Sequence, residues 1–319
     1  MSQLRVGVVG CGRMGRERAR CSHALDARVE VVVDLDHGRS TDMASKYGAK
    51  AASSADDCFR AGVDAIFVCT APGSRGPLEL SCIESGTPFM VEKPVGISAE
   101  PCSALVRQLQ QRPVVNAVGY MNRYRKSVLL AREILSRSTL IGVSAHWVCR
   151  PYGVEWWTDE RSSGGPHNEQ ATHLFDLMRF LLGEIVEIES MFQGPSRVSS
   201  VVKFRSGAIG TVFYSCDAQA KDIGLHIFAR EGSLTLRGWD FAMTGNTIDG
   251  VLPAMENEDI FLAETRTFLE AVRLQRRDLV RSDFADASHT QRVMDAARQS
   301  SITGRAVRLT YPAGCGAQG

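Results

Sequence analysis

The chain has 319 residues, of which 44% are hydrophobic and 23% charged, enough for one large domain or two ordinary ones. Lys and Arg number 37 and Asp and Glu 36, so the formal net charge is +1, which argues against nucleic acid or a membrane surface as a partner. No apolar run reaches the roughly 20 residues that span a bilayer. The nine cysteines are scattered without a C-x-x-C pair. With no signal-peptide pattern at the start, we expect a cytoplasmic protein with reduced thiols.

Short apolar runs alternate with longer amphipathic segments over the first 120 residues. Near-continuous hydrophobicity is typical of strands covered on both faces of a parallel sheet, and the intervening segments are long enough for crossover helices. The runs are Leu4–Val9, Val29–Val33, Ala65–Cys69, Phe89–Val91 and Val114–Val118. Residues 1–120 are therefore predicted to form an α/β domain.

The pattern changes near Tyr120, where we place a domain boundary. From Ile141 to Cys149 the odd positions are apolar, as in a strand with one buried face. Turns at 205–207 and 230–232 predict hairpins and an antiparallel sheet. Further strands are expected at 186–192, 201–205, 209–215, 225–229 and 234–237, and helices at 169–182, 261–274 and 290–301. Residues 121–319 are predicted to form a second, α+β domain.

A glycine-rich turn, Gly10-Cys11-Gly12-Arg13-Met14-Gly15, follows the first predicted strand and precedes a helix. In a dinucleotide-binding turn Gly10 permits the bend, Gly12 lets a diphosphate approach the backbone, and Gly15 lets the helix pack on the strand. The N-terminus of the helix would bind the diphosphate, with Arg13 and Met14 beside it. The alternative is a turn that only packs an ordinary α/β domain.

Asp34 ends the second predicted strand, where a carboxylate can accept hydrogen bonds from the adenosine ribose. It would repel a 2′-phosphate, which favours NAD over NADP. Arg39 lies close enough in sequence to bind that phosphate, so NADP stays open.

Glu92-Lys93-Pro94 follows the predicted strand Phe89–Val91, at the edge where parallel sheets bind ligands. An ammonium there can stabilise negative charge on a reacting oxygen, and Pro94 restricts the backbone of Lys93, with a cis bond as one option. The loop with Thr70 and Pro72 could contact the nicotinamide half of the cofactor. The alternatives are a solvated lysine and a plain turn.

Glu169 and His173 would lie one helical turn apart on the same face. A histidine titrates near neutrality and can accept a hydroxyl proton as hydride leaves the adjacent carbon, while Glu169 could orient it or hold a substrate hydroxyl. One alternative makes His167, Glu169 and His173 zinc ligands, although their spacing fits no strong metal motif; another makes the histidine purely structural.

A substrate rim is expected from aromatic and polar side chains that suit the faces and hydroxyls of a sugar. The candidates are Tyr120, Asn122, Arg123, Trp156 and Trp157. Core packing is the alternative for both tryptophans.

These motifs, in this order, resemble the glucose–fructose oxidoreductase / inositol dehydrogenase / rhizopine catabolism family (Gfo/Idh/MocA). The resemblance rests on Gly10–Gly15, Thr70-Ala71-Pro72, Glu92-Lys93-Pro94, Gly119–Tyr124, Gly164-Gly165 and the segment with Glu169, His173 and Asp176. It implies an N-terminal Rossmann domain, which is a doubly wound parallel sheet, and a C-terminal α+β domain with an open, mostly antiparallel sheet.

By the same resemblance, Lys93 matches the family's active-site lysine and His173 its catalytic histidine. Glu169 stands where many relatives carry aspartate, and Gly76 stands where many carry histidine. The outer face of the second sheet commonly forms the oligomer interface in relatives, so a homodimer or homotetramer is expected.

The combined prediction is an NAD(P)-dependent oxidoreductase without a metal, acting on a secondary alcohol or ketone of a sugar, cyclitol or sugar derivative. A non-catalytic dinucleotide-binding sensor or co-regulator is one alternative. A reductase of a non-sugar substrate, such as an imine or a dihydrodiol, is another.

Overall fold

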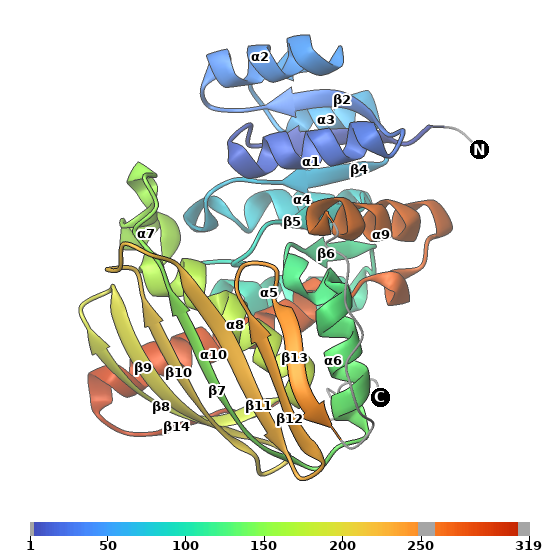
Figure 1. Cartoon of the computed structure of the whole chain (residues 1–319). Helices are drawn as coiled ribbons and strands as arrows, with labels where there is room; N and C mark the ends of the chain where they lie inside the picture. Colours follow the sequence, from blue (N-terminus) through green and yellow to red (C-terminus); the bar gives the residue numbers. More distant parts are fainter. Residues whose placement is uncertain (1–2, 248–258, 312–319) are drawn as a thin grey trace. The chain divides into compact units, whose positions relative to one another are not determined.

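The computed structural model describes residues 3–247 and 259–311. The chain divides into two compact units, each with one sheet (Figure 1). The first unit contains residues 1–96, 100–121 and 259–288, and the second contains residues 97–99, 122–258 and 289–319. No helix in the described ranges is both long and apolar enough to cross a membrane.

The first unit is built on a six-stranded sheet of order β3-β2-β1-β4-β5-β6, in which every pairing is parallel. The strands are β1 (Arg5–Val9), β2 (Arg28–Val33), β3 (Lys50–Ala52), β4 (Ala65–Val68), β5 (Phe89–Val91) and β6 (Asn116–Val118). This confirms the predicted doubly wound sheet. Strand β3 was not predicted, because its three residues lack an apolar run.

Helices cover both faces of the first sheet. They are α1 (Arg13–Ala24), α2 (His37–Tyr47), α3 (Asp56–Ala61), α4 (Pro77–Ser85), α5 (Ala99–Gln111), α9 (Ile260–Leu274) and the start of α10 (Phe284–Thr303). One core joins the strands to α1, α2 and α9, and the other joins them to α3, α4, α5 and α10. Because parallel strands are buried on both sides, their sequences are apolar at nearly every position.

The second unit is built on an eight-stranded sheet of order β13-β12-β11-β7-β10-β9-β8-β14. Only the β7–β10 pairing is parallel, so the predicted mostly antiparallel sheet is confirmed. The strands are β7 (Leu140–Val148), β8 (Ile185–Gln193), β9 (Arg197–Phe204), β10 (Ile209–Ser215), β11 (Asp222–Ala229), β12 (Gly232–Arg237), β13 (Ala242–Thr247) and β14 (Val307–Arg308). The turns at 205–207 and 230–232 join antiparallel neighbours, as predicted.

The described helices of the second unit pack on one face of this sheet, and none of them covers the other face (Figure 1). They are α6 (Lys126–Ser136), the short α7 (Glu160–Ser163), α8 (Thr172–Leu182) and the rest of α10. The predicted alternation of β7 holds from Val143 onward but fails at Ile141, which is 57% exposed. A bulge causes this: Phe228 pairs with Gly142 and Ala229 with Leu140, so Ile141 is skipped in the ladder and turns outward.

The helix predicted at 169–182 begins differently from the expectation. A π-helical turn, His167–Ala171, precedes the regular helix α8, which begins at Thr172. Glu169 therefore lies in the π turn and His173 in the first turn of α8, rather than both in one regular helix. Single π turns of this kind are rare and occur often at functional sites.

Helix α9 belongs to the first unit, whereas the sequence prediction put all of residues 121–319 in the second domain. Phe268 of α9 packs edge-on against Phe67 of β4, with ring centroids 5.4 Å apart, inside the core shared with α1. Periodicity alone shows that α9 is amphipathic but not which sheet its apolar face covers. The chain leaves the first unit after Met121, close to the predicted boundary at 120.

Candidate active site

The glycine turn lies between β1 and α1 and leaves no room for a side chain at two of its glycines. Gly10 has a φ of +96°, and a Cβ there would lie 2.6 Å from the carbonyl oxygen of Cys69. A Cβ on Gly15 would lie 1.8 Å from the carbonyl oxygen of Gly10. At Gly12, by contrast, a Cβ would meet nothing within 4 Å. This open space at the N-terminus of α1 suits a diphosphate, which free backbone N–H groups and the helix dipole would stabilise.

The backbone holds the Asp34 carboxylate in a fixed orientation at the end of β2. Oδ2 accepts the N–H of Cys11 at 2.6 Å, and Oδ1 accepts the N–H of Asp36 at 2.8 Å. Because Cys11 belongs to the glycine turn, the carboxylate and the turn form one rigid piece. Each oxygen retains a lone pair for a ribose hydroxyl. Arg39, weighed as a ligand of a 2′-phosphate, forms an exposed ion pair with Asp36 at 3.2 Å.

Lys93 follows β5 at the carboxyl edge of the first sheet, the edge that also carries Gly10 and Asp34. Its peptide bond to Pro94 is cis. Lys93 is half-buried, whereas its neighbours Glu92 and Pro94 are buried. The residues on both sides of the lysine are therefore enclosed, while Lys93 itself remains partly exposed.

Glu92 takes part in a buried ion cluster with α1 and α9. Arg18 Nε donates to Glu92 Oε1 at 2.7 Å, and Arg18 Nη2 donates to Glu264 Oε2 at 2.6 Å. Burial opposes the charge on Arg18, but the two carboxylates outweigh it and raise the pKa of the guanidinium. A Cβ on Gly119 would lie 2.6 Å from Glu92 Oε2, so the cluster also requires glycine there. A direct contact of Glu92 with the cofactor remains a prediction beside this structural role.

The loop after β4 contains Thr70 and Pro72 and is tied to the segment after β5. Arg75 Nη2 donates to the carbonyl oxygen of Thr70 at 2.8 Å, and Arg75 Nη1 donates to the carbonyl oxygen of Pro94. Pro72 is buried and begins a short 3₁₀ helix, Pro72–Ser74. The proposed contact of this loop with a nicotinamide ring stays a prediction.

In the second unit, His173 and Glu169 are both buried, with 4% and 6% of their surface exposed. The His173 ring stacks on the Trp147 indole of β7, with centroids 5.3 Å apart and ring planes 13° apart. This stacking fixes the plane of the imidazole. A general base needs such a fixed orientation, because its nitrogen must point at the proton that it accepts. Glu169 in the π turn and His173 in the first turn of α8 are thus both buried in the second unit, four residues apart in the sequence.

Arg123 forms a buried two-pronged ion pair with Asp176 of α8. Its Nε and Nη2 donate to the two carboxylate oxygens at 2.9 and 2.6 Å, and Thr290 Oγ1 donates to Asp176 Oδ1 at 3.2 Å. Asp176 follows His173 by three residues, so this pair anchors the helical turn that presents the histidine. The substrate contact proposed for Arg123 stays a prediction, with this anchoring role beside it.

Several buried polar atoms of the second unit have no hydrogen-bond partner in the structure. They include Asn122 Nδ2, Arg125 Nη2, Trp157 Nε1, His167 Nε2 and Gln170 Oε1. Such atoms are rare in native proteins unless water or a ligand satisfies them. Asn122 and Arg125 are joined, since Arg125 Nε donates to Asn122 Oδ1 at 2.9 Å. These atoms are not all in one place, because His167 packs on Phe192 of β8, near one edge of the second sheet, whereas Arg125 packs on Trp239 between β12 and β13, at the other edge.

The remaining rim candidates lie in different surroundings. Tyr120 is 1% exposed and packs in a core of the first unit, and Trp157 is 2% exposed in the core of the second. Trp156 is 39% exposed. Lys93 belongs to the first unit and His173 to the second, so their joint action on one substrate remains a prediction.

The zinc alternative does not match the geometry. In the described parts of the chain, one group of three potential ligands brings its atoms within 4.8 Å of one another, and it consists of Glu17, Cys21 and Asp259. Arg20 already pairs with the two carboxylates of that group, at 2.5 and 2.6 Å. Among the described residues, His167, Glu169 and His173 do not form such a group, and the His167 ring instead packs against Phe192 with centroids 4.7 Å apart.

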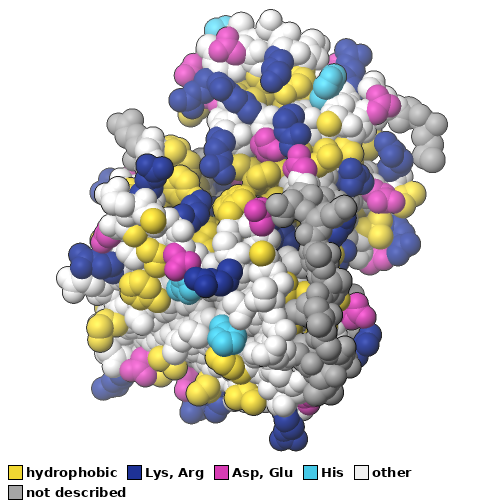
Figure 2. All heavy atoms as spheres, viewed as in Figure 1, with side chains coloured by type: hydrophobic (Ala, Val, Ile, Leu, Met, Phe, Trp, Pro, Cys, Tyr) yellow, Lys and Arg dark blue, Asp and Glu magenta, His cyan; other side chains and the backbone are white. Residues whose placement is uncertain are grey.

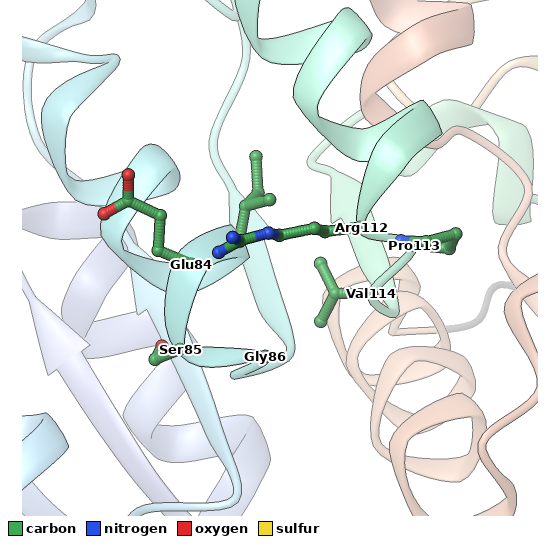
Figure 3. A pocket seen from close by; sticks show the side chains of 7 residues that line it. Glu84, Ser85, Gly86, Arg112, Pro113 and Val114 are labelled. Carbon is green, nitrogen blue, oxygen red and sulfur yellow. The ribbon is translucent and has the colours of Figure 1, made fainter.

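A pocket of about 400 Å³ lies elsewhere in the first unit, between the end of α4 and the turn that leads into β6. Figure 3 shows Arg112 extending from the end of α5 toward the last turn of α4. Gly86 and Val114, which line the pocket, precede β5 and β6. The pocket therefore lies at the opposite edge of the parallel sheet from Asp34 and Lys93.

The sequence reasoning missed Arg18, Arg75, Arg125 and Trp147. Arg18 lies one helical turn beyond Gly15, and Arg75 lies next to Gly76, the position already noted as unusual. Neither position in the sequence reveals which groups the arginine side chain contacts. For Trp147, the alternation within β7 indicated an inward side chain, but only the fold shows that it meets His173.

Two family models match the chain. Residues 4–120 match the NAD-binding Rossmann fold of the Gfo/Idh/MocA oxidoreductase family, and residues 139–235 match the C-terminal domain of the same family. Together they cover more than half of the chain. The chain belongs to the Gfo/Idh/MocA family of NAD-binding oxidoreductases, as the order of its motifs predicted.

Among curated relatives, inositol 2-dehydrogenase 1 of Saccharopolyspora erythraea is 33% identical over 195 residues, which are 58% of this chain and 56% of that protein. The chain thus spans a little over half the length of this relative. The scyllo-inositol 2-dehydrogenase (NAD(+)) of Bacillus subtilis is 25% identical over 336 aligned positions that cover 96% of each protein.

Solved structures share the fold over nearly the whole chain. GenD2 from gentamicin A biosynthesis, in complex with NAD, has a TM-score of 0.85 at 23% identity and covers 98% of this chain and 97% of its own. Levoglucosan dehydrogenase in complex with NADH has a TM-score of 0.85 at 17% identity, covering 97% and 100%. At these identities the likeness shows the fold alone.

Proposed function

We propose that this protein transfers hydride between NAD and a secondary alcohol or ketone of a sugar, cyclitol or sugar derivative. The observation that carries the proposal is the position of Lys93. It lies at the carboxyl edge of an NAD-binding sheet, on the edge that holds the glycine turn and Asp34. The named relatives, two inositol dehydrogenases, support the substrate class.

NAD, when bound, supplies the hydride acceptor, and the reduced cofactor supplies the donor in the reverse direction. Asp34 would accept hydrogen bonds from the adenosine ribose, and the N-terminus of α1 would bind the diphosphate. Lys93 would donate a hydrogen bond to the reacting oxygen and stabilise its negative charge. His173 would take the hydroxyl proton, and stacking on Trp147 would fix the plane of its ring.

A lysine exchange tests the proposal. Lys93→Ala should keep NAD binding and lose most turnover, by about 100-fold or more. Lys50→Ala is the matched control, because the Lys50 side chain is 65% exposed on the outer strand β3, where it pairs with Asp57 at 3.1 Å. Both variants would be measured by absorbance of reduced nicotinamide, with NAD and NADP, against sugars, polyols and their keto forms. Equal turnover in the Lys93 and Lys50 variants would refute the assignment.

The same screen separates the alternatives. A non-catalytic sensor would bind NAD, as measured by protein fluorescence or calorimetry during a titration. It would catalyse neither oxidation nor reduction of any compound in the screen. A reductase of imines or dihydrodiols would be active only with those compounds. Asp34 supports NAD over NADP, because its carboxylate would repel a 2′-phosphate.

We infer that the protein forms a homo-oligomer through the outer face of the second sheet. Five adjacent strands expose apolar residues there, each with between 39% and 77% of its surface accessible. These residues are Ile141, Met191, Val201, Ile209, Phe213 and Phe228. Figure 2 shows hydrophobic side chains spread over this face among polar ones. Apolar side chains exposed on five adjacent strands suit contact with a second copy of the chain. Val201→Glu with Phe213→Glu should lower the mass by light scattering to that of a monomer; an unchanged mass would contradict this interface.

The cysteines support the proposed cytoplasmic location. All eight in the described ranges are free thiols, and burial raises the pKa of most of them, to about 11 at Cys11 and about 12 at Cys58. Protonated, buried thiols resist oxidation and need no disulfide partner.

A further inference from the structure

The backbone ladder between β4 and β5 stops just short of Lys93. It pairs Val68 with Val91, and its last bond runs from the Glu92 N–H to the Val68 carbonyl oxygen at 2.9 Å. Beyond that point the chain after β4 and the chain after β5 separate into two loops. One loop contains Thr70, and the other contains Lys93.

Arg75 joins these two loops with a single guanidinium. Its Nη2 donates to Thr70 O at 2.8 Å, and its Nη1 donates to Pro94 O, the residue directly after Lys93. We propose that Arg75 is a positioning residue that extends the sheet beyond its ladder and fixes the backbone of Lys93 for hydride transfer. This inference rests on the function proposed above for Lys93.

The geometry explains why an arginine serves here. The guanidinium is planar and presents donors in a fixed fork, so it can bind two carbonyl oxygens at once and hold them at a set separation. A lysine carries the same charge as a point, without that fork. Arg75 is also half-buried, which keeps both bonds from full competition with water.

A second observation shows that the charge of Arg75 matters locally. Glu79 is fully buried in α4 and accepts the N–H of Gly76 at 2.7 Å. Burial raises the pKa of this carboxyl, and the positive charge of Arg75 opposes the rise. Removing the charge would disturb Glu79 as well as the loops. We call the two bonds from Arg75 to the carbonyl oxygens of Thr70 and Pro94 the clamp. A test of the clamp needs a variant that keeps the positive charge of residue 75 and loses only the fork of donors.

Lys93 is held from its other side as well. Glu92, directly before it, is fixed by Arg18 in the buried ion cluster. Lys93 thus lies between one residue anchored through its side chain and one anchored through its carbonyl oxygen. With Glu92 anchored, losing Arg75 should loosen the segment from Pro94 onward and the Thr70 loop, while the core stays intact.

The test compares Arg75→Lys with Arg75→Met and with the control Arg60→Met, an exposed arginine of α3. Hydrogen exchange of the intact protein would be followed in peptides covering residues 69–76 and 90–97. Both Arg75 variants should raise exchange at the amides of residues 74 and 75 by about 10-fold or more, because two charge-assisted bonds are lost, whereas the Glu92 amide should stay protected by its bond to Val68 O. Arg60→Met should change neither. Unchanged exchange in both Arg75 variants overturns the clamp, whatever happens to turnover.

Kinetics test the positioning role. Arg75→Lys should lower kcat by about 10- to 100-fold, as a misplaced catalytic group does, while the Kd for NAD stays within about threefold. The deuterium isotope effect on kcat with a labelled alcohol should rise, because the chemical step becomes rate-limiting. Faster exchange with unchanged kcat would overturn the positioning role. A wild-type protein that turns over no alcohol would instead sink the proposed function, and the exchange result would still decide whether the clamp exists.

Discussion

Replacing Arg18 with methionine should destabilise the first unit strongly. Methionine has a similar length and no charge, so Glu92 and Glu264 would stay buried without their cation. The exposed fractions of those carboxylate side chains are 7% and 1%, and they lie 2.7 and 2.6 Å from the guanidinium. Removing one member of such a cluster typically costs about 3–5 kcal/mol. For a unit of this size that corresponds to a fall of about 10–15 °C in melting temperature.

Tryptophan fluorescence can show which unit loses stability in Arg18→Met. All four, Trp147, Trp156, Trp157 and Trp239, belong to the second unit. In Arg18→Met, far-UV circular dichroism should show an early unfolding phase that tryptophan fluorescence does not report, and saturating NAD should delay that phase.

A combined variant separates the cost of unpaired charge from lost packing. Arg18→Met with Glu92→Gln and Glu264→Gln removes every charge in the cluster and should recover most of the lost stability. A loss below about 1 kcal/mol in Arg18→Met would refute the reasoning. So would a combined variant less stable than the single one.

Three further changes test other parts of the structure. Asp34→Ala should raise the Kd for NAD by about 10- to 100-fold without weakening NADP to the same degree, and titration of both cofactors would show a parallel loss if the carboxylate were not selective. Gly15→Ala should abolish NAD binding and lower stability, since its Cβ would lie 1.8 Å from the Gly10 carbonyl oxygen; a variant with normal binding and melting temperature would contradict the close packing. Burial alone would raise the pKa of Glu184, but its hydrogen bonds with Arg179 and His289 lower it to about 2. A depressed pKa stabilises the folded state above the unfolded value of 4.5, so Glu184→Gln should cost about 3 kcal/mol at pH 7. The difference in free energy of unfolding between the wild type and the variant should narrow as the pH falls from 4.5 toward 2. Urea unfolding followed by tryptophan fluorescence measures this difference, and a value independent of pH would contradict the prediction.

The fold could be predicted because its main determinants are local. Buried parallel strands are apolar throughout, and half-buried antiparallel strands alternate, so both sheets show in the sequence. Strands β3 and β13 were missed because Lys50–Ala52 and Ala242–Thr247 have neither pattern. They belong to their sheets by pairing with β2 and β12, a long-range property.

The candidate site was predictable where a backbone requirement leaves a residue signature. Gly10 and Gly15 are glycines because a Cβ would collide with carbonyl groups, and Asp34 is recognisable by its place after β2. Arg75 has no such signature, because it donates to backbone oxygens that any residue could supply. The partners of Arg18 were also hidden, since Glu264 lies 246 residues further along the chain.

That separation bears on how the protein is made. The strands of the first unit leave the ribosome early, but Glu264 and Phe268 of α9, which complete its ion cluster and one of its cores, emerge only after strands β7 to β13 of the second sheet have been synthesised. Until then Arg18 can pair with Glu92 alone, and the apolar surface that α9 covers stays exposed to chaperones. A nascent chain stalled before residue 259 should therefore bind NAD poorly although its glycine turn is complete.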